Sequence, residues 1–316
     1  MILAIFAITL GFIALTLSAD RFVTGAVAIA RQWHISPMLI GLTVVSIGTS
    51  APEILVSIMA AAQGHADIAV GNAIGSNIAN IGLVLGITAL IAPLVIKKKL
   101  AHREIPWLVL VTLTAGASMI DGYLGRLDSL LLIILLVLTM YLMFRWQSDQ
   151  PDEIPDEISL SEKLTKRSAW LHLIGGLIIL LSSSHLLVWG AVHAAKIMGV
   201  SQLVIGLTIV AIGTSLPELA ASVMSALRNQ HDIALGNIAG SNIFNLLAVF
   251  AIPGIISPGH LDSAVIMRDY PVMLGLTLLL ALWVISKKTH RISRWAGVFF
   301  LMCFIAYEIG LYIQLS

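Results

Sequence analysis

The feature that most constrains the fold of this chain is a block of 40 residues that occurs twice, 165 residues apart. Residues 41–80 align without a gap on residues 206–245, and 23 of the 40 aligned positions are identical. The strongest matches pair G-T-S-A-P-E (48–53) with G-T-S-L-P-E (213–218), and G-S-N-I-A-N (75–80) with G-S-N-I-F-N (240–245). A duplication of this length indicates that the chain is built from two related structural units.

The chain is too apolar to be a water-soluble enzyme. Of its 316 residues 58% are hydrophobic and 11% are charged, whereas about a quarter of the residues in an average soluble domain are charged. A membrane-spanning helix needs about 20 apolar residues. Ten segments qualify, at residues 2–30, 38–62, 67–93, 105–120, 127–145, 169–195, 203–227, 232–256, 269–286 and 294–314. The sequence therefore predicts an all-α polytopic membrane protein with about ten transmembrane helices.

Charge and cysteine content narrow the possible partners. The formal net charge of +1 provides no basic excess that would bind nucleic acid. Cys303 is the single cysteine, so an internal disulfide and a thiolate metal cluster are both excluded. We expect the chain to be surrounded by the lipid bilayer, to bind no nucleic acid and to need no cofactor.

The basic residues predict how the two halves are oriented. Five spans are an odd number, so the second half enters the membrane inverted relative to the first. If the gaps after spans 1, 3, 5, 7 and 9 face the cytoplasm, they hold 14 of the 18 Lys and Arg residues, against 3 in the other gaps. The positive-inside rule then places both termini outside. We expect two inverted five-helix repeats at 1–145 and 169–316, an acidic cytoplasmic linker at 146–168, and a monomer.

Each copy of the block carries a proline followed by a glutamate inside an apolar span. Pro52 and Pro217 lack the amide hydrogen that an inner helical turn needs, so a carbonyl oxygen one turn earlier loses its helical partner. A carboxylate within a span is costly and normally marks an ion or proton path, which makes Glu53 and Glu218 candidates. One such turn alone could be an ordinary kink. Two copies at a constant offset predict a site between the halves, near the membrane midplane.

Each of the other candidate ligands has a side-chain oxygen and lies either in the glutamate turn or in the G-S-N-I-x-N turn. They are Thr49, Ser50, Ser76 and Asn80 in the first half, and Thr214, Ser215, Ser241 and Asn245 in the second. Hard cations such as Ca²⁺ and Na⁺ prefer oxygen ligands. Neither His nor Cys accompanies the set, which disfavours zinc and copper.

Small residues predict close helix packing around this set. Gly71 with Gly75, and Gly236 with Gly240, form small-xxx-small ridges. Counting the predicted spans in order, these ridges would let helix 3 approach helix 2, and helix 8 approach helix 7. Asn77 and Asn242 point elsewhere on their helices than the serines before them, and we expect both to make interhelical hydrogen bonds.

At these residues the sequence resembles the sodium/calcium exchangers of the cation/calcium antiporter superfamily, in its bacterial inner-membrane branch. The G-T-S-x-P-E and G-S-N-I-x-N turns look like the two alpha repeats of that family, and the resemblance covers the whole ten-span plan. It implies a calcium site between Glu53 and Glu218 and the exchange of three Na⁺ for one Ca²⁺. It also implies sodium sites formed by Thr49, Ser50, Ser76, Thr214, Ser215 and Ser241 and by the backbone carbonyls of Ser46 and Ala211. Helices 1 and 6 are implied to slide past a core of helices 2, 3, 7 and 8.

The sequence departs from many relatives at one pair of positions. Asn80 and Asn245 are both amides, whereas one of the two matching positions is often an aspartate in the family. The site then holds at most two formal negative charges, from the two glutamates. An acid at the second-repeat position is typical of the potassium-dependent branch, so Asn245 argues against K⁺ co-transport and leaves the sodium stoichiometry open.

These features predict an antiporter that extrudes Ca²⁺ in exchange for Na⁺ across the bacterial cytoplasmic membrane by alternating access. With two carboxylates, one Ca²⁺ neutralises the site and three Na⁺ leave it at +1, so the exchange would move charge worth about 2.3 kcal/mol per 100 mV. A proton/calcium antiporter remains open, because the same glutamates could carry protons. A passive cation channel is a further alternative. A membrane enzyme is disfavoured, since the spans carry no Ser-His pair or paired Asp with proteolytic spacing.

Overall fold

The computed structural model of the 316-residue chain describes all residues except 98–99, 149–163, 200–208, 210, 287–290 and 316. The first half contains α1 (Ile2–Gln32), α2 (Pro37–Ile40), η1 (Gly41–Val45), α3 (Ser46–Thr49), α4 (Ala51–Ala62), α5 (Ala66–Ala79), η2 (Asn80–Val84), α6 (Leu85–Ile91), β1 (Leu94–Val95), η3 (Leu100–Glu104), α7 (Ile105–Ala117), β2 (Tyr123–Leu124) and α8 (Arg126–Ser148). The second half contains α9 (Lys166–Ile197), α11 (Ala211–Thr214), α12 (Leu216–Leu227), α13 (His231–Phe244), η6 (Asn245–Val249), α14 (Ala251–Ile256), β3 (Gly259–His260), η7 (Val265–Asp269), α15 (Tyr270–Ser286), β4 (Arg291–Ile292) and α16 (Arg294–Leu315). The elements labelled η are single π-helical turns within longer helices.

The described α-helices overlap the predicted apolar segments and account for eight of the ten predicted spans by length and composition. Seven of the helices in the described chain are long and apolar enough to cross a membrane, and the bent pair 37–49 and 51–62 makes an eighth. Two of the ten predicted spans correspond to shorter helices, α7 and α12. Most of the predicted linker, and residues 203–208 and 210 of the predicted seventh span, lie outside the described residues.

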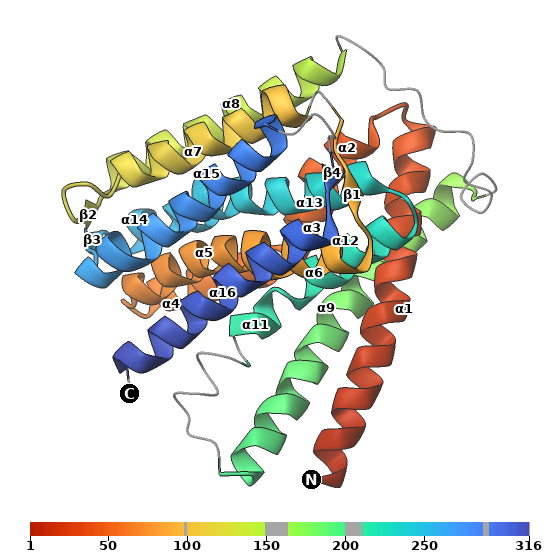
Figure 1. Ribbon diagram of the computed structural model, residues 1–316, viewed down its shortest axis with the longest axis horizontal. Coiled ribbons are helices and arrows are strands. Elements are labelled where there is room, and N and C mark those ends of the chain that lie inside the picture. Colours follow the sequence, from red (N-terminus) through yellow and green to blue (C-terminus); the bar gives the residue numbers. More distant parts are fainter. Residues whose placement is uncertain (98–99, 149–163, 200–208, 210, 287–290, 316) are drawn as a thin grey trace.

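The first helices of the two halves, α1 and α9, pack side by side in opposite directions (Figure 1). Glycines allow their backbones to touch: Gly11 lies against Leu187, and Gly176 lies against Phe22. These two contacts are equivalent, because Gly176 and Leu187 each follow their counterparts by 165 positions. Residue numbers rise along α1 as they fall along α9, so equivalent helices of the two halves run antiparallel.

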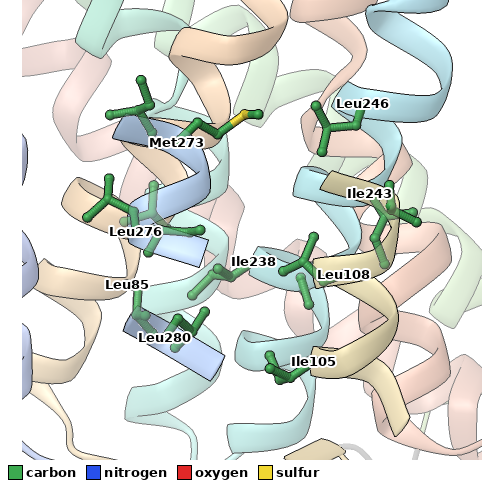
Figure 2. Packing of buried hydrophobic residues seen from close by; sticks show 14 of the residues in the cluster. Leu85, Ile105, Leu108, Ile238, Ile243, Leu246, Met273, Leu276 and Leu280 are labelled. Carbon is green, nitrogen blue, oxygen red and sulfur yellow. The ribbon is translucent and has the colours of Figure 1, made fainter. Parts of the chain in front are cut away.

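The centre of the molecule is formed by α5 to α6 and α13 to α14. About 78% and 83% of the apolar stretch of these two spans is buried, against 39% or less for the other long helices. Figure 2 shows side chains from α6, α7, α13 and α15 meeting in this core, among them Leu85, Leu108, Ile238 and Met273. Lipid is as apolar as these side chains, so the core is stabilised mainly by close packing. The polar turns predicted as the site lie on these central helices and on the helices that pack against them.

Four short strands join the halves, an addition to the predicted all-helical fold. β1 pairs with β4 and β3 pairs with β2, both antiparallel, so each pair takes one strand from each half. Next to each strand pair lies a charged residue, and its sign differs between the two halves. Lys97 forms an ion pair of 2.6 Å with Asp232, whereas at the equivalent positions the backbone amide of Asp262 donates to a carboxylate oxygen of Asp67 at 3.2 Å. Lys97 and Asp262 thus occupy equivalent places in the two halves.

Candidate functional site

The two glutamate turns interrupt their helices at equivalent positions. The helix over 37–49 and the helix over 51–62 meet at an angle of 46° at Ser50, and Ser215 separates α11 from α12 in the same way. Pro52 and Pro217 lie in the first turn of the following helix, where the amide that proline lacks has no helical partner to lose. The break therefore leaves the last turn of the preceding helix uncontinued, and it does not distort the helix that carries the glutamate.

One of the two carbonyl oxygens predicted to be freed by the prolines, that of Gly213, has a side-chain donor. The hydroxyl of Ser184 on α9 donates to the carbonyl of Gly213 at 3.2 Å. The carbonyl of Ser46 accepts from the backbone amide of Ser50 at 2.9 Å and from the Thr49 hydroxyl at 3.3 Å. Thr49 has one hydroxyl hydrogen, which it can donate to the side-chain oxygen of Asn237 at 3.1 Å instead. The Ser46 carbonyl then holds a single donor, and its second lone pair can face an ion.

Glycines bring the two halves together at the site, but against a partner that differs from the prediction. A Cβ atom on Gly240 would lie 2.6 Å from the Leu42 carbonyl oxygen and from the Ser46 hydroxyl, and one on Gly236 would lie 2.7 Å from the Met38 carbonyl. The glycine ridge on α13, the predicted eighth span, therefore receives the helix over 37–49 of the other half, and the prediction that the ridge packs against the seventh span is wrong. Helix α13 does contact α12, which is part of that seventh span, through a different face that carries Asn237. In the first half, a Cβ atom added at Gly71 or Gly75 would meet no atom of the described chain within 4 Å, and both glycines line a cavity.

This close approach produces hydrogen bonds across the two halves. Ser50 donates to the Glu218 carboxylate at 3.1 Å, and Thr49 donates to the side-chain oxygen of Asn237 at 3.1 Å. Asn237 in turn donates to the Glu218 backbone carbonyl at 3.3 Å and to the Ser222 hydroxyl at 2.9 Å. Hydroxyls predicted from the first half thus lie against the glutamate of the second.

Asn72 and Asn237 are site residues that sequence reasoning missed. Asn72 donates to the Glu53 carbonyl at 3.0 Å and to Ser57 at 3.1 Å, repeating the two bonds that Asn237 makes in the other half. Both asparagines are identical in the two copies of the block and stand one turn before the predicted serines. That identity was the available signal.

Several buried side-chain atoms around the glutamates have no hydrogen-bond partner within the described part of the chain. The eight atoms are one carboxylate oxygen each of Glu53 and Glu218, the hydroxyls of Ser215 and Ser241, and both amide heteroatoms of Asn80 and Asn245. Each glutamate is only 1% exposed. An unsatisfied buried polar group costs about 1–3 kcal/mol. Six of the eight atoms are oxygens, which are the ligands that hard cations prefer, so this part of the cluster fits a bound cation.

The asparagines of the G-S-N-I-x-N turns lie where the central helices change their winding. Asn80 begins η2 and Asn245 begins η6, both single π-helical turns, a feature common at functional sites. Asn77 donates across the helices to the Asn242 carbonyl at 3.1 Å, which confirms its predicted interhelical bond. The side chain of Asn242 instead donates to Ile238 on its own helix at 2.8 Å, so that prediction is wrong.

The remaining candidates occupy the same region. Ser46 and Ser76 are buried, Thr214 is half-buried at the end of α11, and the backbone of Ala211 begins that helix. Among the described residues no three His, Cys, Asp or Glu side chains group together as a metal site. The candidate ligands of the site are therefore two carboxylates and neutral oxygens.

The two halves of the site differ in packing. Thr49 contacts Asn237, whereas the equivalent pair, Thr214 and Asn72, lines a cavity of about 170 Å³. Ser76 lies on the wall of this cavity, and α16 supplies the opposite wall with Phe304, Tyr307 and Glu308. The cavity therefore reaches the candidate ligands from one side.

Comparison with known proteins gives concordant matches over nearly the whole chain. Residues 3–145 and 168–313 match the family model described as sodium/calcium exchanger protein. The chain is 48% identical to the putative antiporter CaxA of Alkalimonas amylolytica over 99% of both chains. It is 38% identical to the inner membrane protein YrbG of Escherichia coli, covering 99% of this chain and 98% of that one. A solved structure of the sodium-calcium exchanger NCX_Mj matches with a TM-score of 0.83 and 36% identity, covering 98% of this chain and 99% of the other.

Proposed function

Because this chain belongs to the sodium/calcium exchanger family and is a multi-pass integral membrane protein, we propose that it extrudes Ca²⁺ from the cytoplasm in exchange for Na⁺. The observation that carries the proposal is the cluster of unpartnered buried oxygens around Glu53 and Glu218. Ca²⁺ binds between the two carboxylates, which it neutralises.

Sodium is the proposed counter-ion because of the neutral ligands that surround the carboxylates. Proton exchange needs only the glutamates, whereas Na⁺ needs a shell of uncharged oxygens. Hydroxyls stand next to the carboxylates from both halves: Ser50 contacts Glu218, and the Ser215 and Ser241 hydroxyls are buried without partners among the described residues. We assign the Na⁺ sites to Thr49, Ser50, Ser76, Thr214, Ser215 and Ser241 with the carbonyls of Ser46 and Ala211, and further Ca²⁺ contacts to Asn80 and Asn245.

Alternating access is the proposed transport mechanism. The glycine ridge of α13 packs against the helix over 37–49 on one side of the site, while the equivalent glycines, Gly71 and Gly75, line a cavity on the other. Exchanging these two arrangements between the halves would open the site to the opposite face. The antiparallel pair α1 and α9 is proposed to slide during this exchange, since its glycine-lined contact presents smooth backbone surfaces.

The proposed topology has ten spans in two inverted repeats, at 1–145 and 169–316, with an acidic cytoplasmic linker at 146–168 and both termini outside. The antiparallel packing of α1 against α9 supports the inversion. Each half supplies ligands to one shared site, so a monomer suffices.

The direct test is ⁴⁵Ca²⁺ uptake into proteoliposomes loaded with Na⁺, K⁺ or acid. Uptake driven only by outward Na⁺, and abolished in Glu53→Gln and in Glu218→Gln, is the expected result. Glu104→Gln is a matched control, because Glu104 is also a buried acid but lies on η3, away from the glutamate turns. Uptake driven by acid loading would identify a proton antiporter, and uptake without any counter-gradient would identify a channel.

A further inference from the structure

We propose that Glu308 is a cation-attracting carboxylate in the vestibule through which ions enter the site from the outer face. The proposal rests on the exchange function proposed above and assigns a role to a residue that the binding site does not use. Glu308 lines the same cavity as Asn72, Ser76 and Thr214.

The position of the cavity follows from how α16 packs. Gly82 lies against Phe304 and Gly86 lies against Leu301, so α16 runs antiparallel to the span formed by α5 and α6. The cavity lies beyond this contact, toward the start of α5 and the C-terminal end of α16. In the proposed topology both of these ends face outward, so the cavity connects the outer face with the candidate ligands.

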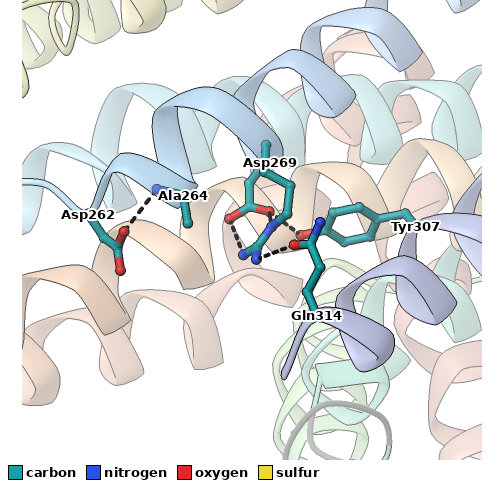
Figure 3. A network of polar contacts seen from close by, with 6 residues as sticks. Asp262, Ala264, Asp269, Tyr307 and Gln314 are labelled. Carbon is teal, nitrogen blue, oxygen red and sulfur yellow. Dashed lines mark hydrogen bonds and ion pairs between the residues drawn. The ribbon is translucent and has the colours of Figure 1, made fainter. Parts of the chain in front are cut away.

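Glu308 is suited to act on ions that pass through this space. Its side chain is half-buried, and its Oε2 atom is buried without a hydrogen-bond partner among the described residues. The neighbouring carboxylate of Asp269, by contrast, has donors. The next residue, Tyr307, donates a bond of 2.9 Å to Asp269, and Asp269 is also paired with Arg268 at 2.7 Å (Figure 3).

This network fixes the position of the vestibule wall, and within it the positive charge of Arg268 is paired with Asp269. Two of the arginine nitrogens donate to Asp269, and a third donates to Gln314 at 3.1 Å (Figure 3). The positive charge beside this part of α16 is therefore already paired with an acid. When Glu308 is ionised, its charge remains to attract cations in the cavity.

Glu308 occurs in only one of the two repeats. The residue 165 positions earlier is Met143, which is buried on α8. The entrance formed by the equivalent helices of the first half thus carries an apolar side chain where the outer vestibule carries an acid. The effect of Glu308 should accordingly be confined to ions that bind from outside.

The physical signature of such a group is its dependence on ion charge. A fixed charge in a cleft raises the local concentration of a cation by a Boltzmann factor, and doubling the ion charge squares that factor. If Glu308 enriches Na⁺ about threefold, it enriches Ca²⁺ about ninefold, and added inert salt weakens both effects. A residue that coordinates one ion directly would not obey this square relation.

The test compares wild type with Glu308→Gln in right-side-out and inside-out membrane vesicles. In right-side-out vesicles the variant should raise the half-saturating external Na⁺ about threefold and the half-saturating external Ca²⁺ about ninefold, with an unchanged maximal rate. Choline chloride should shrink both shifts, and Glu308→Asp should restore most of the wild-type values. Asp262→Asn is the matched control, because Asp262 is an exposed acid outside the cavity lining, and it should shift neither constant.

Unchanged external constants in Glu308→Gln, or equal shifts at both faces, would overturn the proposal. A shift in Ca²⁺ alone would also overturn it, since that result identifies a ligand rather than a long-range attraction. Failure of the wild type to exchange Na⁺ for Ca²⁺ would instead overturn the proposed function. The wild-type measurement therefore separates the two failures.

Discussion

Gly240→Ala should uncouple the two halves of the site while leaving the helices intact. The added Cβ would lie 2.6 Å from the Leu42 carbonyl oxygen and the Ser46 hydroxyl, whereas ordinary contacts begin at about 3.4 Å. Backbone cannot rotate away, so helix 37–49 must withdraw by roughly 0.8 Å. The same helix leads into Ser50, whose bond to Glu218 measures 3.1 Å and would lengthen to about 3.9 Å, beyond hydrogen-bond range.

The expected loss follows from the value of that bond. A hydrogen bond to a charged group contributes about 1.5–3 kcal/mol, which corresponds to a roughly 10- to 150-fold change in an equilibrium constant. Na⁺-driven ⁴⁵Ca²⁺ uptake by Gly240→Ala should therefore fall at least about tenfold at subsaturating Ca²⁺. Gly275→Ala on α15 is the control, because a Cβ added at Gly275 would meet no atom within 4 Å. Wild-type uptake by Gly240→Ala, or an equal loss in Gly275→Ala, would refute the reasoning.

Three further outcomes are expected. Asn237→Ala should reduce uptake about tenfold, because Asn237 accepts from Thr49 and donates to the Glu218 carbonyl; unchanged uptake by this variant would contradict the place of Asn237 in the site. Gly176→Ala should lower the melting temperature in detergent, whereas its neighbour Gly175→Ala should not, since only the first meets backbone of α1; indistinguishable melting curves would contradict the packing of α1 on α9. Acidic external medium should inhibit Ca²⁺ uptake competitively, because a proton on either site carboxylate removes charge that Ca²⁺ needs; inhibition that excess Ca²⁺ does not relieve would argue against competition at the site.

The duplication made the central turns predictable. Pro52 and Pro217 each stand where one helix ends and another begins, and a break that occurs twice in equivalent positions has the same local cause in both. The buried glutamates followed from the cost of a carboxylate in a membrane. Both expectations depend on chemistry within one turn of helix, which sequence records directly.

The helix partners could not be predicted in the same way. Gly236 and Gly240 mark a face that backbone approaches, but their spacing is the same whichever helix fills the groove. The neighbour proved to be helix 37–49 of the other half. Asn72 and Asn237 were missed for a related reason, because their value comes from main-chain acceptors on another helix, and these are invisible in a list of side chains.

Glu308 illustrates what a repeat-based interpretation leaves out. Comparison of the halves draws attention to residues that occur twice, and Glu308 aligns with Met143 in that comparison. An antiporter, however, works between unequal solutions, and a symmetric pair of entrances would treat both alike. The duplicated residues can hold ions in either arrangement of the site, while a residue present in one half alone can adapt one entrance to the medium it meets. The differences between the repeats are therefore as informative about transport as their identities.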